Sequence, residues 1–509
     1  MDMTSEHIVA LLPIILITAT SVIVMLLAAF LRNHKLVASV TVIGLLAALW
    51  SLSLQLNAPP LQITPLLLVD PYSVFYAAIM IVTVIAVTIL SYGYFVLREG
   101  LQEELYILLL TSTLGAIVLV FSSHFAAFFL GLELMSISLF ALVAYPVTTL
   151  TRQGEPLEAS LKYLVLSGVS SAFLAFGMCL IYAATGTMFF PELAIALSNL
   201  DHNYYAIAGT AMVVAGTGFK LSVVPFHMWT PDIYQGAPAP VSSFVATVSK
   251  GAVLITLLKI FILLDVYQYE SIIMALTLIA GASMIIGNLL ALLQTNVKRL
   301  LAYSSTAHMG YALVAFLAAK SLVAGDSLAV EAVGYYMVAY IITTLTAFGI
   351  ISVLSSDQEH IDQNRDFELL EDFRGLFWKH PYIASVFIAS LLSLAGIPLT
   401  VGFIGKFYIV ATGVQSEMWP LILALVIGSS IGLYYYLRLV FIMFLKQEES
   451  EDEGFASAAQ ANLSVQSSDI ALPVGGQIVV AILALLILCL GVYPTPLIEA
   501  IQIYSSGIG

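Results

Sequence analysis

The sequence is poor in charged residues. Asp, Glu, Lys and Arg make up 9% of its 509 residues, whereas hydrophobic residues make up 61%. Soluble globular domains carry about 25% charged residues, so this composition excludes a soluble fold and indicates a polytopic membrane protein. We expect a single membrane domain over residues 1–509, in contact with the lipid bilayer. No cleavable signal peptide is expected, because the first apolar stretch is as long as a membrane span and lacks a basic segment before it.

Cysteine is scarce, and cofactor motifs are lacking. Cys179 and Cys489 lie inside apolar runs without a CxxC pattern or a nearby His, so we expect small buried hydrophobic side chains. We expect no disulfide, iron–sulfur cluster or zinc site. The sequence has no GxGxxG motif after a strand, no Walker A motif and no cluster of haem or metal ligands. The chain is therefore predicted to bind no cofactor and to perform no redox chemistry or nucleotide hydrolysis of its own.

The net charge of −14 comes largely from two stretches. Seven acidic residues lie between Asp357 and Asp372, and five lie between Glu448 and Glu453. We interpret both stretches as exposed loops whose charges keep them soluble, not as binding sites. No nucleic-acid partner is expected.

Apolar runs recur along the whole sequence. Each is about 20 residues long, which is enough for a helix to cross the roughly 30 Å hydrocarbon core of a bilayer. The sequence therefore predicts an all-α polytopic membrane protein with about fourteen transmembrane helices, at about 8–30, 36–56, 72–97, 104–122, 124–145, 160–184, 205–225, 240–264, 271–293, 297–319, 329–354, 381–412, 419–445 and 476–494. The stretch Phe189–Leu200 is too short to cross and predicts an interfacial helix.

The basic residues predict the orientation, because cytoplasmic loops carry an excess of Lys and Arg. With a periplasmic N-terminus, only Lys259 and Lys320 fall outside, and Lys259 can extend to the interface and keep its charge solvated. Eleven basic residues fall inside: Arg32, Lys35, Arg98, Arg152, Lys298, Arg299, Arg365, Arg374, Lys379, Arg438 and Lys446. The remaining four of the seventeen lie within spans: Lys162, Lys220, Lys250 and Lys406.

Proline interrupts the seventh predicted span. Pro225 follows Lys220 by five residues, and it cannot bond the carbonyl of Leu221. The helix should therefore break. Freed backbone groups are tolerated in a bilayer only where protein or a water-filled cavity satisfies them. A lysine beside such a break indicates an ion path, and a lysine that only extends to a helix end is the alternative.

The twelfth predicted span is interrupted in the same way. Pro398 leaves the carbonyl of Leu394 without its partner, and Lys406 follows eight residues later. The two interrupted spans are five spans apart, so they run in opposite directions, which predicts two inverted-topology repeats. The chain then divides into N-terminal helices at 1–100, a first repeat at 104–264, a second repeat at 271–445, an acidic cytoplasmic loop at 446–475 and a last helix at 476–509.

Several titratable side chains fall inside the predicted spans. Glu133 lies about ten residues into the fifth span without a charged neighbour within two turns. Such a carboxyl is either protonated and hydrogen-bonded or paired with a cation, and Lys220 is the natural partner. Lys250 lies near the middle of the eighth span. Lys162 and Glu158 are secondary candidates, although their i, i+4 spacing also fits a simple pair on a helix surface.

His308 adds a polar stripe to the tenth span. It lies in AYSSTAHMGYALVAF, one turn after Ser304. A stripe of this kind can hold a file of water between lysines, so His308 is a candidate relay or gate. A histidine that is only hydrogen-bonded is the alternative. Six tyrosines of the eleventh and thirteenth spans can extend this path or can be interfacial aromatics: Tyr335, Tyr336, Tyr340, Tyr434, Tyr435 and Tyr436.

Three blocks carry a resemblance that covers nearly the whole chain. GFKLSVVPFHMWTPDIYQGAPAPVSSFVATVSK, NLLALLQTNVKRLLAYSSTAHMGYALVA and LSLAGIPLTVGFIGKFY closely resemble the antiporter-like membrane subunits of the respiratory NADH–quinone oxidoreductase, complex I. Within this family, the opening MDMTSEHIVALLP and the block LELMSISLFALVAYP are similar to one bacterial branch. Lys406 favours the same branch, because another branch has glutamate at this position. The short stretch after the last span also favours this branch.

The resemblance implies fourteen helices with two inverted five-helix repeats and a pair of proton half-channels along a central polar axis. It implies that Glu133 pairs with Lys220, that Lys250 is the central lysine and Lys406 the exit-side residue, and that His308 is the family's tenth-helix histidine. It also implies that NADH, FMN, iron–sulfur clusters and quinone bind to other subunits. The expected partners are a neighbouring antiporter-like subunit, small membrane subunits and peripheral subunits, in a bacterial inner membrane.

The expected function is proton translocation by a membrane subunit of a redox-driven pump. Electron transfer from NADH to quinone takes place elsewhere and is coupled to proton transfer along buried Lys, Glu and His side chains. One alternative is a stand-alone sodium/proton antiporter of the homologous family. Another is a scaffold subunit whose channel is idle.

Overall fold

The structure is a computed structural model that describes residues 5–56, 58–96, 98, 100, 102–145, 155–198, 203–319, 328–356, 365–446 and 472–505. Some residues of the sequence interpretation lie outside these ranges, namely Arg152, Lys320, Asp357 and the acidic residues between 448 and 453. Most of the predicted loop at 446–475 lies outside them as well.

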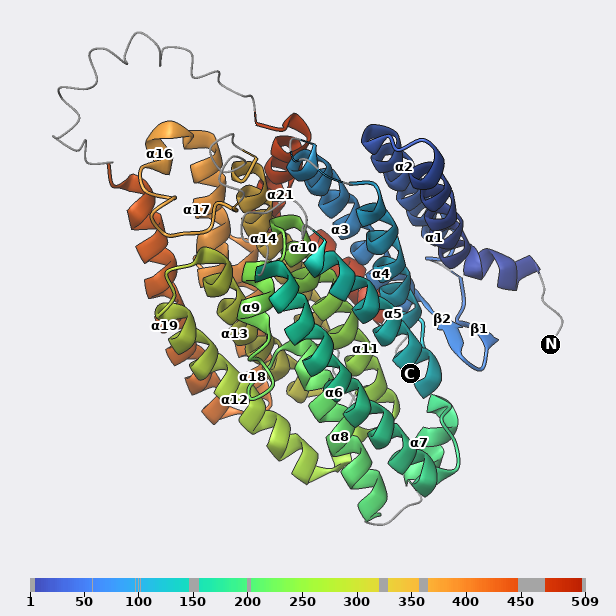
Figure 1. Cartoon of the computed structure of the whole chain (residues 1–509). Helices are drawn as coiled ribbons and strands as arrows, with labels where there is room; N and C mark the ends of the chain where they lie inside the picture. The colour runs from blue at the N-terminus through green and yellow to red at the C-terminus, as the bar shows by residue number, and fades with distance from the viewer. Residues whose placement is uncertain are drawn as a thin grey trace, which may run out of the picture.

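The described chain is mostly helical (Figure 1). Eleven of its helices are long and apolar enough to cross a membrane: α1 (Ser5–Phe30), α2 (His34–Ser53), α3 (Pro71–Phe95), α5 (Phe125–Ala144), α6 (Glu155–Thr185), the continuous helical segment Ala239–Leu263, α12 (Glu270–Leu292), α13 (Val297–Ala318), α14 (Leu328–Leu354), α19 (Trp419–Phe444) and α21 (Val474–Val492). Three shorter apolar helices are α4 (Glu104–Val120), α17 (Pro381–Ala395) and α18 (Val401–Gln415). The protein is therefore a multi-pass membrane protein.

The remaining elements are α8 (Tyr204–Leu221) and several short segments. These are α7 (Phe190–Ser198), α9 (Thr230–Gly236), a 3-10 helical turn (Val266–Gln268), α16 (Leu376–Lys379), α22 (Thr495–Ser505) and the antiparallel strands β1 (Leu61–Thr64) and β2 (Leu67–Val69). Within Ala239–Leu263, α10 (Ala239–Phe244) passes through a π-helical turn (Val245–Ser249) into α11 (Lys250–Leu263). The short helix α7 lies where the sequence predicted an interfacial helix.

The most polar long helix lies at the centre of the bundle. We compared the most apolar 18-residue stretch of each helix. All residues of this stretch are buried in α13 and α14, whereas only 28% of them are buried in α1. Helices α1 and α2 stand at one edge, and α12 and α19 at the other (Figure 1). The lysine, serine and histidine side chains of α13 are costly in lipid. Its central position surrounds them with protein.

Helix α8 ends at Leu221, and α9 begins nine residues later at Thr230, with Pro225 between them. Other parts of the protein satisfy backbone groups in this interval. The indole N–H of Trp229 donates to the carbonyl of Phe219 at 3.0 Å, and the Val224 N–H donates to Ser283 Oγ at 2.9 Å. Backbone without helical hydrogen bonds is tolerated at membrane depth under this condition.

A similar interval separates α17 from α18 and contains Pro398. Helix α17 ends at Ala395, and its C-cap Gly396 has φ +86°, a left-handed conformation that favours glycine. A Cβ atom added at Gly402 would lie 1.9 Å from the carbonyl oxygen of Ser393. Only glycine therefore allows the first turn of α18 to approach the end of α17 so closely.

Three expectations from the sequence are wrong. Cys179 and Cys489 are free but exposed on the outer surface of the bundle, because a helix that is apolar all round gives no sign of which face is inward. Lys259 is 3% exposed rather than solvated at the interface, because α3 supplies a buried acid as its partner. The acidic stretch after Asp357 is not uniformly exposed, since Asp366 and Glu368 are buried beside basic residues.

Candidate proton-transfer site

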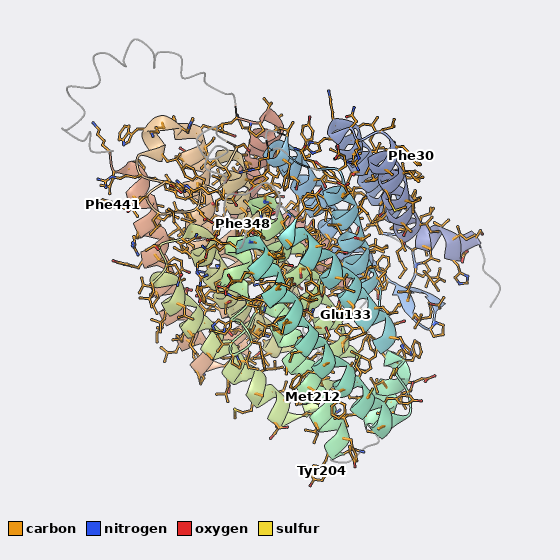
Figure 2. All side chains as sticks on the ribbon, in the orientation of Figure 1. Phe30, Glu133, Tyr204, Met212, Phe348 and Phe441 are labelled. Atoms are coloured by element: carbon orange, nitrogen blue, oxygen red, sulfur yellow. The ribbon has the colours of Figure 1, made fainter. Side chains whose placement is uncertain are left out.

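Glu133 and Lys220 each bind serine side chains, but not the same ones. Lys220 is 2% exposed, and its Nζ donates to Ser136 Oγ at 2.7 Å and Ser167 Oγ at 2.6 Å. Glu133, labelled partway along α5 in Figure 2, accepts a hydrogen bond from Ser171. No ion pair within 4.0 Å joins Glu133 to Lys220, although both residues are described. Glu133 lies on α5 and Lys220 on α8, and the serine partners of both residues lie on α5 and α6.

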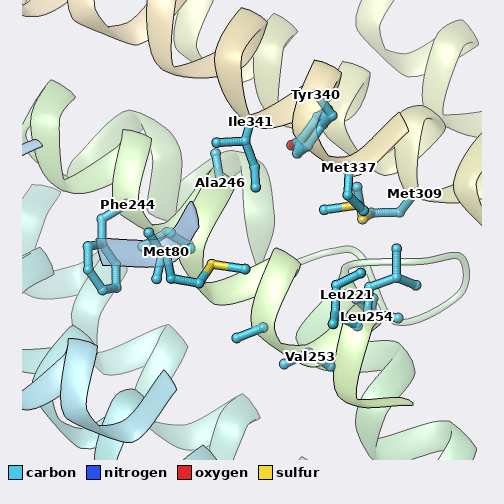
Figure 3. Packing of buried hydrophobic residues seen from close by; sticks show 14 of the residues in the cluster. Met80, Leu221, Phe244, Ala246, Val253, Leu254, Met309, Met337, Tyr340 and Ile341 are labelled. Atoms are coloured by element: carbon cyan, nitrogen blue, oxygen red, sulfur yellow. The ribbon is translucent and has the colours of Figure 1, made fainter. Parts of the chain in front are cut away.

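Lys250 is fully buried near the middle of the helical segment Ala239–Leu263. Its Nζ donates to Ser305 Oγ at 2.6 Å and lies 5.5 Å from the ring centre of Tyr234. Ser305 in turn hydrogen-bonds to the hydroxyl of Tyr340 at 2.6 Å. Apolar side chains of other helices pack against this helical segment, including Met80, Met337 and Ile341 (Figure 3). The ammonium group therefore has a hydroxyl and an aromatic ring as polar contacts inside an apolar region.

Two tyrosines flank His308 on α13. Its Nδ1 lies 2.6 Å from the hydroxyl of Tyr336, and its Nε2 lies 3.4 Å from that of Tyr436. The Tyr436 hydroxyl also bonds Ser304, one turn before His308 on the same helix. His308 is 5% exposed, so protein groups provide its polar surroundings. The structure thus extends the predicted serine and histidine stripe by tyrosines from α14 and α19.

Lys406 lies beside the interval between α17 and α18. Its Nζ donates to the carbonyl of Ala395 at 2.8 Å, at the C-terminal end of α17, where the helix dipole favours a cation. The same nitrogen lies 5.1 Å from the ring centre of Tyr311. Tyr311 follows His308 by one turn on α13, and the two rings are 5.5 Å apart. Lys406 therefore reaches the same helix as Lys250, α13, one to two turns further along it.

Lys162 and Glu158 form the expected i, i+4 ion pair, at 2.8 Å. Asp232 of α9 is a second partner of Lys162 at 2.9 Å, and it also binds Arg299 at 2.7 Å. These residues line a polar cavity of about 210 Å³ at the end of α6, together with Glu155, Ala159, Gln235 and Gly236. Lys162 is 45% exposed, whereas Lys220 and Lys250 are buried and Lys406 is half-buried.

Other polar residues of the site were not identified from the sequence. The three serines beside Glu133 and Lys220 carry no signal of their own in an apolar helix, because serine is common there. Within the interval between α8 and α9, His227 is 5% exposed and neither ring nitrogen makes a hydrogen bond of good geometry. Its position two residues after Pro225, in the predicted helix interruption, could have identified it as a candidate polar residue of the site. Within the described ranges, no group of three or more His, Cys, Asp or Glu side chains is placed to hold a metal ion.

The fold and this geometry define a class: a polytopic helical membrane protein with a row of buried or half-buried lysine side chains bound by hydroxyl and carbonyl oxygens. A sequence model of the family described as "NADH:quinone oxidoreductase/Mrp antiporter, TM" matches residues 122–432. The chain is also 47% identical over 98% of its length to NADH-quinone oxidoreductase subunit N from Methylococcus capsulatus, and it covers 95% of that protein. The chain belongs to this family of antiporter-like transmembrane subunits.

Solved structures agree with this assignment. A chain of respiratory complex I from Thermus thermophilus with bound aureothin is 30% identical, with a TM-score of 0.77 and coverage of 96% of this chain and 99% of that one. A chain of the membrane-bound sulfane sulfur reductase, an archaeal respiratory membrane complex, is 25% identical with a TM-score of 0.79 over 99% and 98% of the two chains. The Mrp complex from Dietzia sp. is similar in fold alone, at 18% identity, a TM-score of 0.81 and coverage of 99% and 98%.

Proposed function

We propose that this chain is a proton-translocating subunit N of the membrane arm of an NADH:quinone oxidoreductase. The observation that carries the proposal is the row formed by Lys220, Lys250 and Lys406. Each of these side chains donates a hydrogen bond to a hydroxyl or carbonyl oxygen. The chain that contains them is similar to a subunit N over 98% of its length. Buried lysines are costly in a membrane protein and are retained for function. The row provides sites for protons but no group that could drive them.

The proposed topology has fourteen spans. Helices α8 and α9 together form the seventh span and α17 and α18 the twelfth, each interrupted at its proline, and α4 is a shorter span. The first repeat covers residues 104–264 and the second 271–445, in opposite orientations. The N-terminus lies on the periplasmic side of a bacterial inner membrane, as the distribution of basic residues indicates.

The proposed mechanism couples Glu133 to Lys220. When Glu133 is protonated or drawn away, Lys220 loses a nearby counter-charge and passes its proton toward Lys250. The side chain of His227, and the hydroxyls of Ser222 and Thr230, are buried in the interval after Lys220 without protein partners of good geometry. Buried polar groups of this kind are usually satisfied by water, so they support a hydrated connection between Lys220 and Lys250. Ser305, His308 and the tyrosines around them continue the path to Lys406.

The driving force comes from partner subunits in this proposal. NADH, FMN, iron–sulfur clusters and quinone bind there, and the neighbouring membrane subunits transmit the coupling. The alternative is a stand-alone sodium/proton antiporter, because the description of the matching family also names the Mrp antiporter.

Purification separates the two functions. We expect the affinity-tagged chain, extracted in mild detergent from its own membrane, to bring redox subunits and NADH–quinone activity with it. A monodisperse chain that is isolated alone and exchanges sodium for protons in liposomes would contradict the proposal and support the antiporter.

A further inference from the structure

Lys298 is a buried lysine that the proposed path does not use. It lies in the first turn of α13, and its side chain is 1% exposed. Its Nζ donates to three oxygens: the carbonyl of Gln235 at 2.9 Å, the carbonyl of Ala237 at 2.6 Å and Asp366 Oδ2 at 2.7 Å. All three ammonium protons therefore have an acceptor. A lysine so fully engaged is held in one place.

Two of these acceptors lie at the end of α9. The helix ends at Gly236 with Ala237 as its C-cap, so the Gln235 and Ala237 carbonyls lie where helical acceptors lose their intrahelical donors. A lysine ammonium is a suitable partner for carbonyl oxygens at a helix C-terminus. Lys298 thus joins the last turn of α9 to the first turn of α13.

The third acceptor, Asp366, is itself fixed. The Tyr94 hydroxyl donates to Asp366 Oδ1 at 2.5 Å, and Arg98 lies 3.8 Å from the same oxygen. Burial acts to raise the pKa of Asp366, but the charges of Lys298 and Arg98 and the hydrogen bonds from Lys298 and Tyr94 hold that pKa below its ordinary value. The carboxyl therefore stays ionised at neutral pH and holds Lys298 in place.

The next residue, Arg299, binds the other side of α9. Its guanidinium donates to Asp232 at 2.7 Å and to the side-chain oxygen of Gln235 at 3.0 Å. Arg299 thus binds side chains of α9, and Lys298 binds backbone carbonyls at the carboxyl end of the same helix. Lys298 binds the carboxyl end of α9 inside the protein. Arg299 is partly exposed and binds α9 where this helix lines the polar cavity beside Lys162.

The two helices joined in this way form the surroundings of Lys250. Helix α9 supplies Tyr234, whose ring centre lies 5.5 Å from Lys250 Nζ, and α13 supplies Ser305, which accepts the 2.6 Å hydrogen bond. Ser305 follows Lys298 by seven residues, which places it on the same face of α13 about 10 Å further along the axis. A shift of α9 against α13 would separate Tyr234 from Ser305.

We infer that Lys298 is a positioning residue for proton transfer at Lys250: it locks α9 to α13 so that Tyr234 and Ser305 stay together on the Lys250 ammonium group. The inference rests on the proposed function. It assigns Lys298 no proton of its own to move. Arginine has the same charge and enough donors for the three acceptors but does not release a proton, so it separates positioning from proton transfer.

The experiment measures protons pumped per electron, NADH–quinone turnover and the amount of assembled complex in inverted membrane vesicles. The variants are Lys298→Met, Lys298→Arg and, as a matched control, Lys379→Met, which removes an exposed lysine at α16. We expect Lys298→Met to lower pumping at least about tenfold, because a misplacement of about 1 Å can cost about 100-fold in rate. Lys298→Arg and Lys379→Met should pump as the wild type does.

Two results would overturn the inference. Wild-type pumping by assembled Lys298→Met would show that the lock is not needed. Loss of pumping in Lys298→Arg as complete as in Lys298→Met would show that Lys298 transfers protons itself. If Lys298→Met does not assemble, the double variant Lys298→Met with Asp366→Asn removes the buried carboxylate that has lost its lysine partner. Poor pumping by an assembled double variant would support the positioning role of Lys298. Wild-type pumping by the same variant would overturn that role.

Lys250→Ala belongs in the same series as a reference. If Lys250→Ala pumps normally, the proposed function fails whatever Lys298 does. If Lys250→Ala loses pumping while Lys298→Met retains it, the proposed function stands and only the inference about Lys298 fails.

Discussion

Lys259 and Asp70 form a buried ion pair whose removal should destabilise the protein. Lys259 Nζ lies 2.5 Å from Asp70 Oδ2 and donates to Ser73 Oγ at 2.8 Å, and both side chains are 4% exposed. The other carboxylate oxygen of Asp70 accepts the Ser73 N–H at 2.7 Å and caps the start of α3. The pair therefore fixes α3 to α11, the helix that begins with Lys250.

The size of the effect follows from burial. Removing one partner of a buried ion pair leaves the other charge uncompensated and costs about 3–5 kcal/mol. We expect Lys259→Ala to lose stability in this range and Asp70→Asn to lose less, since asparagine is also a good helix N-cap. The double variant Lys259→Ala with Asp70→Asn removes both charges, so it should lose less stability than the two single changes added together.

The assay is the half-life of NADH–quinone activity of the purified complex at a fixed raised temperature, because large membrane complexes unfold irreversibly. Assembly is quantified in parallel. A half-life of Lys259→Ala equal to that of the wild type would refute the reasoning, and so would a double variant that is as unstable as the sum of its single changes.

Three further changes test other parts of the site. Glu133→Gln and Lys220→Ala should each abolish most pumping, and the double variant should be no worse than either single variant because the residues act as one unit; strictly additive, mild losses of pumping would show independent residues. Lys406→Glu should retain more pumping than Lys406→Ala, since it keeps a titratable group beside α17; full pumping in both would remove Lys406 from the path. Gly396→Ala should lower stability by about 1–2 kcal/mol because residue 396 has a left-handed φ, and it should lower pumping because the added Cβ would lie 2.8 Å from Lys406 Cδ. The control is Gly168→Ala, whose added Cβ would meet nothing within 4 Å. Equal melting temperatures and equal pumping rates for the two variants would count against this reasoning.

The sequence predicted those features of the fold that depend on local chemistry. Apolar runs marked the long helices, and a lost N–H at Pro225 and Pro398 marked where helical structure ends before α9 and before α18. The short helix α7 was predicted from its length. These signals are local because hydrophobicity and proline geometry act within one segment.

Contacts between distant segments could not be predicted in the same way. Lys259 and Asp70 are 189 residues apart, and in a uniformly apolar helix nothing indicates which residue faces which neighbour. For the same reason Tyr336 and Tyr436 could not be told from interfacial aromatics, although they are the partners of His308. The serine partners of Glu133 and Lys220 were also not predicted, because the spacing of the two residues in the sequence does not distinguish a direct ion pair from hydrogen bonds to serine.

The ratio of protons pumped to electrons transferred in a Lys250→Ala complex tests the proposed function most directly. Lys250 is fully buried, lies between Lys220 and Lys406 in the chain and hydrogen-bonds Ser305 on the central helix α13. Both quantities are measured in the same inverted vesicles, with Lys379→Ala as the exposed control. Proton translocation through this chain predicts a lower ratio in assembled Lys250→Ala complex and an unchanged ratio in the control. An unchanged ratio in Lys250→Ala would contradict it and support a scaffold whose channel is idle.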